Sequence, residues 1–197
     1  MFTAATAGSL RRPHLFHAEG FGQGTGMTVG VAREQQVGKA VSRLRGPGIL
    51  LGIGLGGFVD GILFHQILQW HHLLSSRSDD PTNTVAGLET NTLADGLFHA
   101  FTWVVAVVGV WLLWRRTNEW REAANGRALI GWTLVGWGLF NLVEGLINHE
   151  ILGLHHVREG AGHQTAYDVA FLAFGGLLVL SGWLLARSDR HRPPARS

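Results

Sequence analysis

Four long apolar stretches constrain this chain more than any other feature of its sequence. They cover about residues 48–70, 93–114, 128–151 and 167–186. A helix of about 20 apolar residues crosses the hydrocarbon core of a bilayer. Helices and closed barrels are the only structures that satisfy their backbone hydrogen bonds there. We therefore predict an all-α integral membrane protein, a four-helix bundle in the lipid bilayer.

The charged residues, only 15% of the chain, lie almost entirely between and outside these stretches. All Lys and Arg residues except Arg77 and Arg158 fall before the first stretch, between the second and third, or after the fourth. Because Lys and Arg collect on the cytoplasmic side of a membrane, we expect both termini to be cytoplasmic. The chain is expected to cross its membrane several times. The same arginines explain the isoelectric point near 9.9 without a nucleic-acid partner.

The segments outside the spans are polar. Residues 1–46 are predicted to be a disordered cytoplasmic tail, and residues 188–197 a second cytoplasmic tail. Met27 offers an alternative start, in which case residues 1–26 are an over-extended reading frame. The chain has no cysteine, which excludes disulfides, thiolate metal sites and cysteine nucleophiles.

The chain contains an internal repeat. With an offset of 84 residues, Leu51–His72 aligns with Val135–His156 without a gap, and ten of the 22 positions are identical. Asp60 meets Glu144, so the acidic group is kept. We predict two tandem parallel helix-pair repeats, residues 47–116 and 128–187, related by an axis along the membrane normal. The weaker match that follows pairs Asp95 with Asp168 and His99 with Leu172.

The repeated segments carry ionisable groups inside apolar spans. Such groups are costly in a bilayer, so they face the bundle interior and have partners there. Imidazole and carboxylate are ligands of zinc, iron, manganese and copper(II), and helix bundles build such sites from facing helices. The candidate metal ligands are Asp60, His65, His71, His72, Asp95, His99, Glu144, His149, His155, His156 and Asp168.

A continuous α-helix turns about 100° per residue, which divides these candidates. Asp60 and His71 then share one stripe, and His65 and His72 share another. We expect two clusters on this basis. The inner one holds Asp60 and His65 with their repeat mates, Asp95, His99 and Asp168; the outer one holds His71, His72, His155 and His156.

Each candidate also has a simpler interpretation. His71 and His72 lie where headgroups or water satisfy an imidazole. Asp60 and Glu144 are also suited to orienting ligands rather than binding metal. Asp95 and Asp168 stand near span starts, where helix N-capping explains an aspartate. His99 has no repeat counterpart, which makes it a specialised ligand or an incidental residue.

Three segments, DGILFHQILQWHH, LFHAFTW and NLVEGLINHEILGLHHVRE, resemble a bacterial family of predicted membrane proteins. The family is catalogued only as a domain of unknown function. The resemblance covers about residues 47–187. It implies a four-span inner-membrane protein and no established activity.

Several functions remain open at this point. The first is a membrane metallo-oxidoreductase whose metal site, near the outer leaflet, is approached by a quinone or a lipid. The second is a non-enzymatic metal-handling or assembly factor that passes metal to a partner protein. Haem ligated by His65 and His149 is a third, and a scaffold whose polar groups hold helices together is a fourth.

Overall fold

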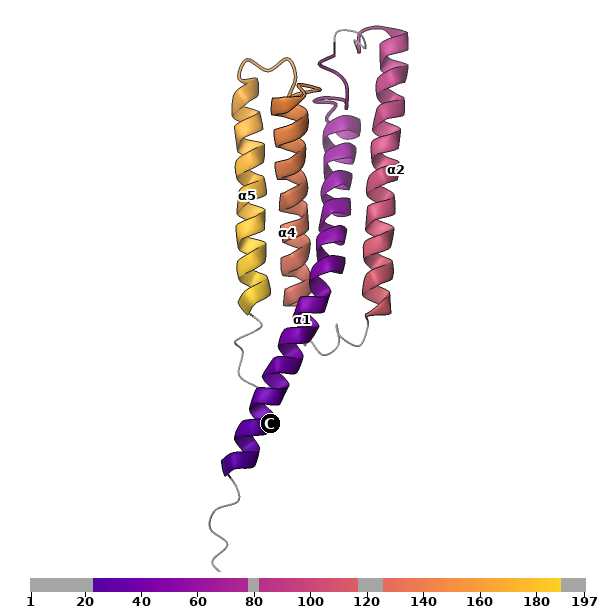
Figure 1. Cartoon of the computed structure of the whole chain (residues 1–197). Helices are drawn as coiled ribbons and strands as arrows, with labels where there is room; N and C mark the ends of the chain where they lie inside the picture. Colours follow the sequence, from indigo (N-terminus) through magenta and orange to yellow (C-terminus); the bar gives the residue numbers. More distant parts are fainter. Residues whose placement is uncertain (1–22, 78–81, 117–125, 189–197) are drawn as a thin grey trace, which may run out of the picture. The chain divides into compact units, whose positions relative to one another are not determined.

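The computed structural model describes residues 23–77, 82–116 and 126–188, and every regular element in those ranges is a helix. Four of its helices are long and apolar enough to cross a membrane, as predicted. Two of them continue into π-helices, which have wider turns. In chain order the elements are α1 (Gln23–Val59), η1 (Asp60–Ile67), α2 (Val85–Arg115), α4 (Arg127–Glu144), η2 (Gly145–Ile151) and α5 (Gln164–Ser188) (Figure 1).

The chain divides into two units, residues 1–33 and 34–197, and the second contains the bundle. Helix α1 begins at Gln23, so the part of the predicted tail from residue 23 to 46 is helical. Its Ala, Arg, Glu, Gln and Lys residues are good helix formers. The rest of that tail, residues 1–22, and residues 189–197 lie outside the described residues.

Helices α1 and α4 form the centre of the bundle, between α2 and α5 (Figure 1). The apolar windows of the first and third spans are each 44% buried, whereas those of α2 and α5 are 11% and 22% buried. The two segments that align in the sequence therefore lie on the two central helices, where polar side chains are best shielded from lipid.

Glycines hold the central helices in contact. A Cβ added to Gly52 would overlap the carbonyl oxygen of Thr133, and one added to Gly136 would overlap that of Ile49. Inside a membrane, small residues let helices approach closely enough for van der Waals packing to hold them. Further close approaches of this kind include those of Gly54 to Ala106 and of Gly131 to Gly182.

Candidate metal centre

The π-helices bring each span carboxylate beside a histidine. His65 Nε2 lies 3.2 Å from Asp60 Oδ2, and His149 Nε2 lies 3.1 Å from Glu144 Oε1. Residues five apart point to different faces of an α-helix. In a π-helix the backbone bonds join residues five apart, so their side chains are neighbours on successive turns. The wider turn therefore places acid and imidazole on one face.

Both π-helices end in a turn of the same type. Gln69 and Gly153 have positive φ angles of 49° and 56°. The next N–H groups, of Trp70 and Leu154, donate to carbonyl oxygens of Phe64 and Asn148 at 2.9 and 2.8 Å. The helix therefore ends just before each histidine pair, and the chain turns back toward the helix there.

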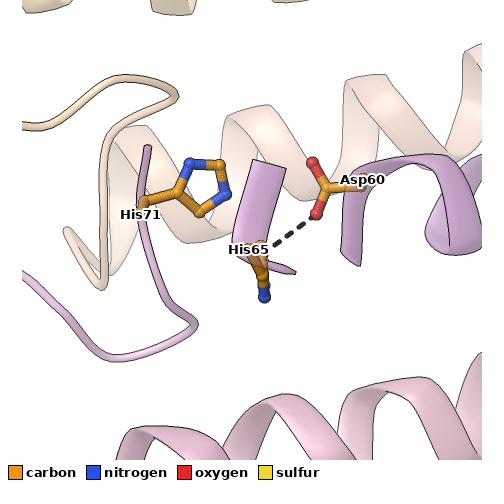
Figure 2. Close-up of side chains that lie close together, drawn as sticks. All are labelled: Asp60, His65 and His71. Atoms are coloured by element: carbon orange, nitrogen blue, oxygen red, sulfur yellow. Dashed lines mark ion pairs between the residues drawn. The ribbon is translucent and has the colours of Figure 1, made fainter. Parts of the chain in front are cut away.

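This return brings the first histidine of each pair back to the carboxylate. Asp60, His65 and His71 offer ligand atoms that all lie within 4.8 Å of one another (Figure 2). Glu144, His149 and His155 form a second group by the same criterion. We call these the first and second triads. Each consists of two histidines and one carboxylate.

The two triads adjoin. The rings of His71 and His155 stack at 4.5 Å with an interplanar angle of 8°. Each ring also meets the other histidine of its own triad edge-on, His65 at 4.6 Å and His149 at 4.8 Å. All six side chains belong to residues no more than 5% exposed. They form one continuous buried cluster.

The Nδ1 atoms point away from the carboxylates of their own triads. His65 Nδ1 donates to Asp95 Oδ1 at 2.9 Å. His71 Nδ1 donates to the carbonyl of Val157 at 2.8 Å, and His155 Nδ1 to that of Leu73 at 3.0 Å. These partners only accept hydrogen bonds, which assigns the proton to Nδ1 and leaves a lone pair on Nε2 of each neutral ring.

The last two bonds are reciprocal. The loop after η1 supplies His71 to the loop after η2, which supplies His155 in return. His149 Nδ1 follows the pattern more loosely, 3.5 Å from Asp168 Oδ1, too far for a hydrogen bond.

The Nε2 atoms point inward and lack ordinary partners. Those of His65, His71 and His149 are buried with no hydrogen-bond partner, as is Glu144 Oε2. His155 Nε2 lies 2.8 Å from Glu144 Oε1, a contact that requires a proton or a cation once Nδ1–H is committed elsewhere. Each buried unpaired polar atom costs about 1–3 kcal/mol.

A metal ion removes that cost, and the spacing fits one. Ligand atoms at about 2.0–2.1 Å from a tetrahedral ion are about 3.3–3.4 Å apart, close to the His65–Asp60 and His149–Glu144 separations of 3.2 and 3.1 Å. Burial, and after it the neighbouring His155 and His65, lower the pKa of His71 to about 2. The ring is therefore neutral, the form in which imidazole binds metal.

Asp95 accepts hydrogen bonds from histidines and caps no helix. It lies ten residues inside α2, whose N-cap is Thr84. Asp95 is 1% exposed. Its carboxylate accepts hydrogen bonds from His72 Nδ1 at 2.7 Å and from the Leu73 N–H at 2.9 Å, in addition to the bond from His65. The N-cap interpretation of Asp95 is wrong because the helix extends beyond the apolar run.

Asp168 makes corresponding contacts in the other half. It accepts from His156 Nδ1 at 2.8 Å and from the Val157 N–H at 2.9 Å. It lies four residues inside α5, so it is not an N-cap either. Carboxylates of this kind fix the tautomer and orientation of a metal-binding histidine.

The predicted division into an inner and an outer cluster is wrong. It assumed an unbroken α-helix through residue 72, whereas η1 ends at Ile67. Each histidine pair is split: His71 and His155 join the buried triads, while His72 and His156 lie at the rim with side chains 18% and 37% exposed.

His99 also lies outside both triads. Its Nδ1 donates to the Asp95 carbonyl at 2.7 Å, and its ring packs against Gly61. Of the predicted ligands, six are therefore brought together, and Asp95, Asp168, His72, His156 and His99 surround them.

Comparison with known proteins gives one match. The model of a family described as "Predicted membrane protein (DUF2243)" matches residues 47–189, which include both triads. No curated protein and no solved structure matches the chain.

Proposed function

The chain belongs to the DUF2243 family of predicted membrane proteins, and we propose that it is a membrane metalloprotein with a dinuclear centre of oxidoreductase type. One ion is held by Asp60, His65 and His71. The other is held by Glu144, His149 and His155.

The inward-facing Nε2 atoms are the observation that carries this proposal. Three of them are buried without a hydrogen-bond partner, two of these 3.1–3.2 Å from a triad carboxylate, and the fourth faces a carboxylate oxygen. The Nδ1 atoms of His65, His71 and His155 face acceptors, so no change of tautomer satisfies both sides of those rings. Pairing with carboxylates could satisfy the Nε2 atoms of His65 and His149 if those rings were protonated, but it would leave His71 Nε2 without a partner. Two cations at the centre give every one of them a partner.

The composition of each triad indicates the chemistry. Two histidines and one carboxylate with open positions are typical of non-haem iron sites. Three protein ligands leave room on the ion for oxygen or substrate. Iron and manganese are therefore the expected metals, with copper and zinc as the other metals that this ligand set accepts.

The burial favours a resident metal over a transported one. A metal-handling factor exchanges its ion with a partner protein, which requires ligands that the partner can reach. The six triad residues are 0–5% exposed. Haem is disfavoured as well, because the stacked rings of His71 and His155 lie against His65 and His149 and leave no slot for a porphyrin.

The distribution of arginines supports placing the centre near the outer leaflet, with both termini cytoplasmic. At that depth the open positions face substrates that dissolve in the bilayer, such as a quinol or a lipid.

The test is the metal content of the chain purified without a histidine tag in mild detergent. We expect about two ions of one metal per chain, with a visible spectrum if the metal is iron or copper. In a His65→Ala/His149→Ala variant both ions should be lost. The matched control is His163→Ala, which removes an exposed loop histidine and should leave the content unchanged.

A folded, colourless protein that takes up no metal when titrated would refute the proposal. Titration of the purified protein is needed because detergent extraction with chelators present strips weakly bound ions. Bound haem would contradict the dinuclear assignment.

A further inference from the structure

The two halves of the centre differ beside the glycine that follows each carboxylate. Gly61 and Gly145 occupy aligned positions. A Cβ on Gly61 would lie 2.5 Å from His99 Nε2, whereas a Cβ on Gly145 would lie 2.9 Å from Leu172 Cδ2. The same niche is therefore occupied by an imidazole in one half and by an aliphatic side chain in the other.

Packing does not explain the imidazole, since leucine fills the corresponding niche. Metal binding does not explain it either, because His99 belongs to neither triad. Its Nδ1–H is donated to the Asp95 carbonyl at 2.7 Å, so Nε2 of the neutral ring carries a lone pair. No group in the described ranges donates a hydrogen bond to that nitrogen.

The surroundings make an unpaired acceptor costly. His99 lies within the candidate span Val85–Arg115 and is partly exposed. Hydrocarbon offers no hydrogen-bond donor, and each unsatisfied polar group there costs several kcal/mol. The Phe98 ring lies 5.9 Å from the His99 ring and 5.7 Å from that of His65, so one aromatic ring separates this nitrogen from a triad ligand.

We propose that His99 Nε2 accepts a hydrogen bond from the hydroxyl group of a lipid-soluble substrate that reaches the centre between η1 and α2. The site takes a phenol or a hydroquinone and disfavours the corresponding ether or quinone, which has no donor. The role as substrate site rests on the proposed function, but the binding itself requires no metal.

The test compares 4-decylphenol with 4-decylanisole, its methyl ether, on protein in lipid nanodiscs. Binding is measured by equilibrium dialysis on wild type and on His99→Leu, which installs the residue of the other half. A net hydrogen bond corresponds to about a 3- to 10-fold difference in affinity. We expect wild type to prefer the phenol by that factor and His99→Leu to show no preference, with equal metal content in both proteins.

A second measurement needs no variant. The ¹⁵N chemical shift of His99 Nε2 in wild type should move on addition of the phenol and stay unchanged with the ether.

Leu172→His, the reverse exchange in the other half, should add a second phenol-preferring site.

Equal affinities of wild type for phenol and ether, or a shift that responds to neither, would overturn the inference. Loss of metal from a folded His99→Leu protein would also overturn it, since His99 would then support the centre. A metal-free protein that still prefers the phenol would leave this inference intact while refuting the proposed function.

Discussion

Replacing Asp95 by asparagine tests whether the carboxylates behind the triads tune the metal. Asp95 is 1% exposed and accepts three hydrogen bonds, from His65 Nδ1, His72 Nδ1 and the Leu73 N–H. Asn is nearly the same size and keeps one acceptor oxygen. The change therefore isolates the charge and one oxygen without opening a cavity.

The expected loss of metal affinity depends on which hydrogen bonds the asparagine preserves. Oδ1 receives both the His65 and the Leu73 bonds, so an Asn carbonyl in that place preserves them. The new amide then faces His72, whose ring lies at the rim and is free to change tautomer. What remains is the loss of negative charge behind His65. Loss of such a partner typically lowers metal affinity 10- to 100-fold, or about 1.4–2.7 kcal/mol.

The assay is competition for metal with a chromophoric chelator, together with thermal unfolding of the metal-free protein. Asp95→Asn should weaken one ion of the two by that factor. Asp168→Asn is the matched variant and should weaken the other ion less, because His149 Nδ1 is 3.5 Å from Asp168 and makes no hydrogen bond to it. Unchanged metal affinity in Asp95→Asn, with lower stability alone, would show that Asp95 only holds the loop.

Three further predictions concern metal removal, the turns and the helix contacts. Chelation should lower the thermal midpoint and metal should restore it, because each bound ion adds about 2.7 kcal/mol to the free energy of unfolding at a free concentration 100 times its Kd; a midpoint indifferent to metal would contradict the centre. Gln69→Gly should raise the free energy of unfolding by about 1 kcal/mol, because Gln69 is exposed at a positive φ. Gly153→Ala should lower the free energy of unfolding. Changes of the opposite sign would contradict the positive φ angles at these two turns. Gly52→Leu should abolish folded protein, since its Cβ would overlap Thr133, whereas Gly96→Leu, with open space around it, should be tolerated in a detergent unfolding assay.

Hydropathy and the repeat predicted the spans and the residue types at the centre. The four apolar runs correspond to the four membrane-length helices. Placing Asp60 opposite Glu144 and His65 opposite His149 selected four of the six triad residues as deep ligands. Apolar runs and identities at a fixed offset are properties of the sequence itself, so no knowledge of turns was needed.

The arrangement of the centre was harder to predict because it depends on helix geometry. A rotation of about 100° per residue places Asp60 and His65 on different faces of an α-helix. The segment DGILFHQI contains no sequence pattern that predicts a π-helix. The break after Leu68 was hidden by a glutamine at a positive φ angle. Its aligned residue, Gly153, was the available signal, since glycine favours such a turn.

The second misplacement concerned Asp95. Hydropathy placed the second span from residue 93, but α2 starts at Val85 because the polar turn capped by Thr84 continues the helix above the apolar run. The carbonyl partners of His71 and His155 could not be predicted from the sequence. Every residue has a carbonyl group, and the conformation of the loops determines which one accepts the hydrogen bond.

X-ray absorption at the metal edge tests the central claim most directly. The account predicts nitrogen and oxygen ligands only, with outer-shell scattering from two imidazoles per ion. His71→Ala should reduce the imidazole scattering without introducing another ligand class. A spectrum with one imidazole or none per ion, or with porphyrin scattering, would contradict a centre built from the two triads.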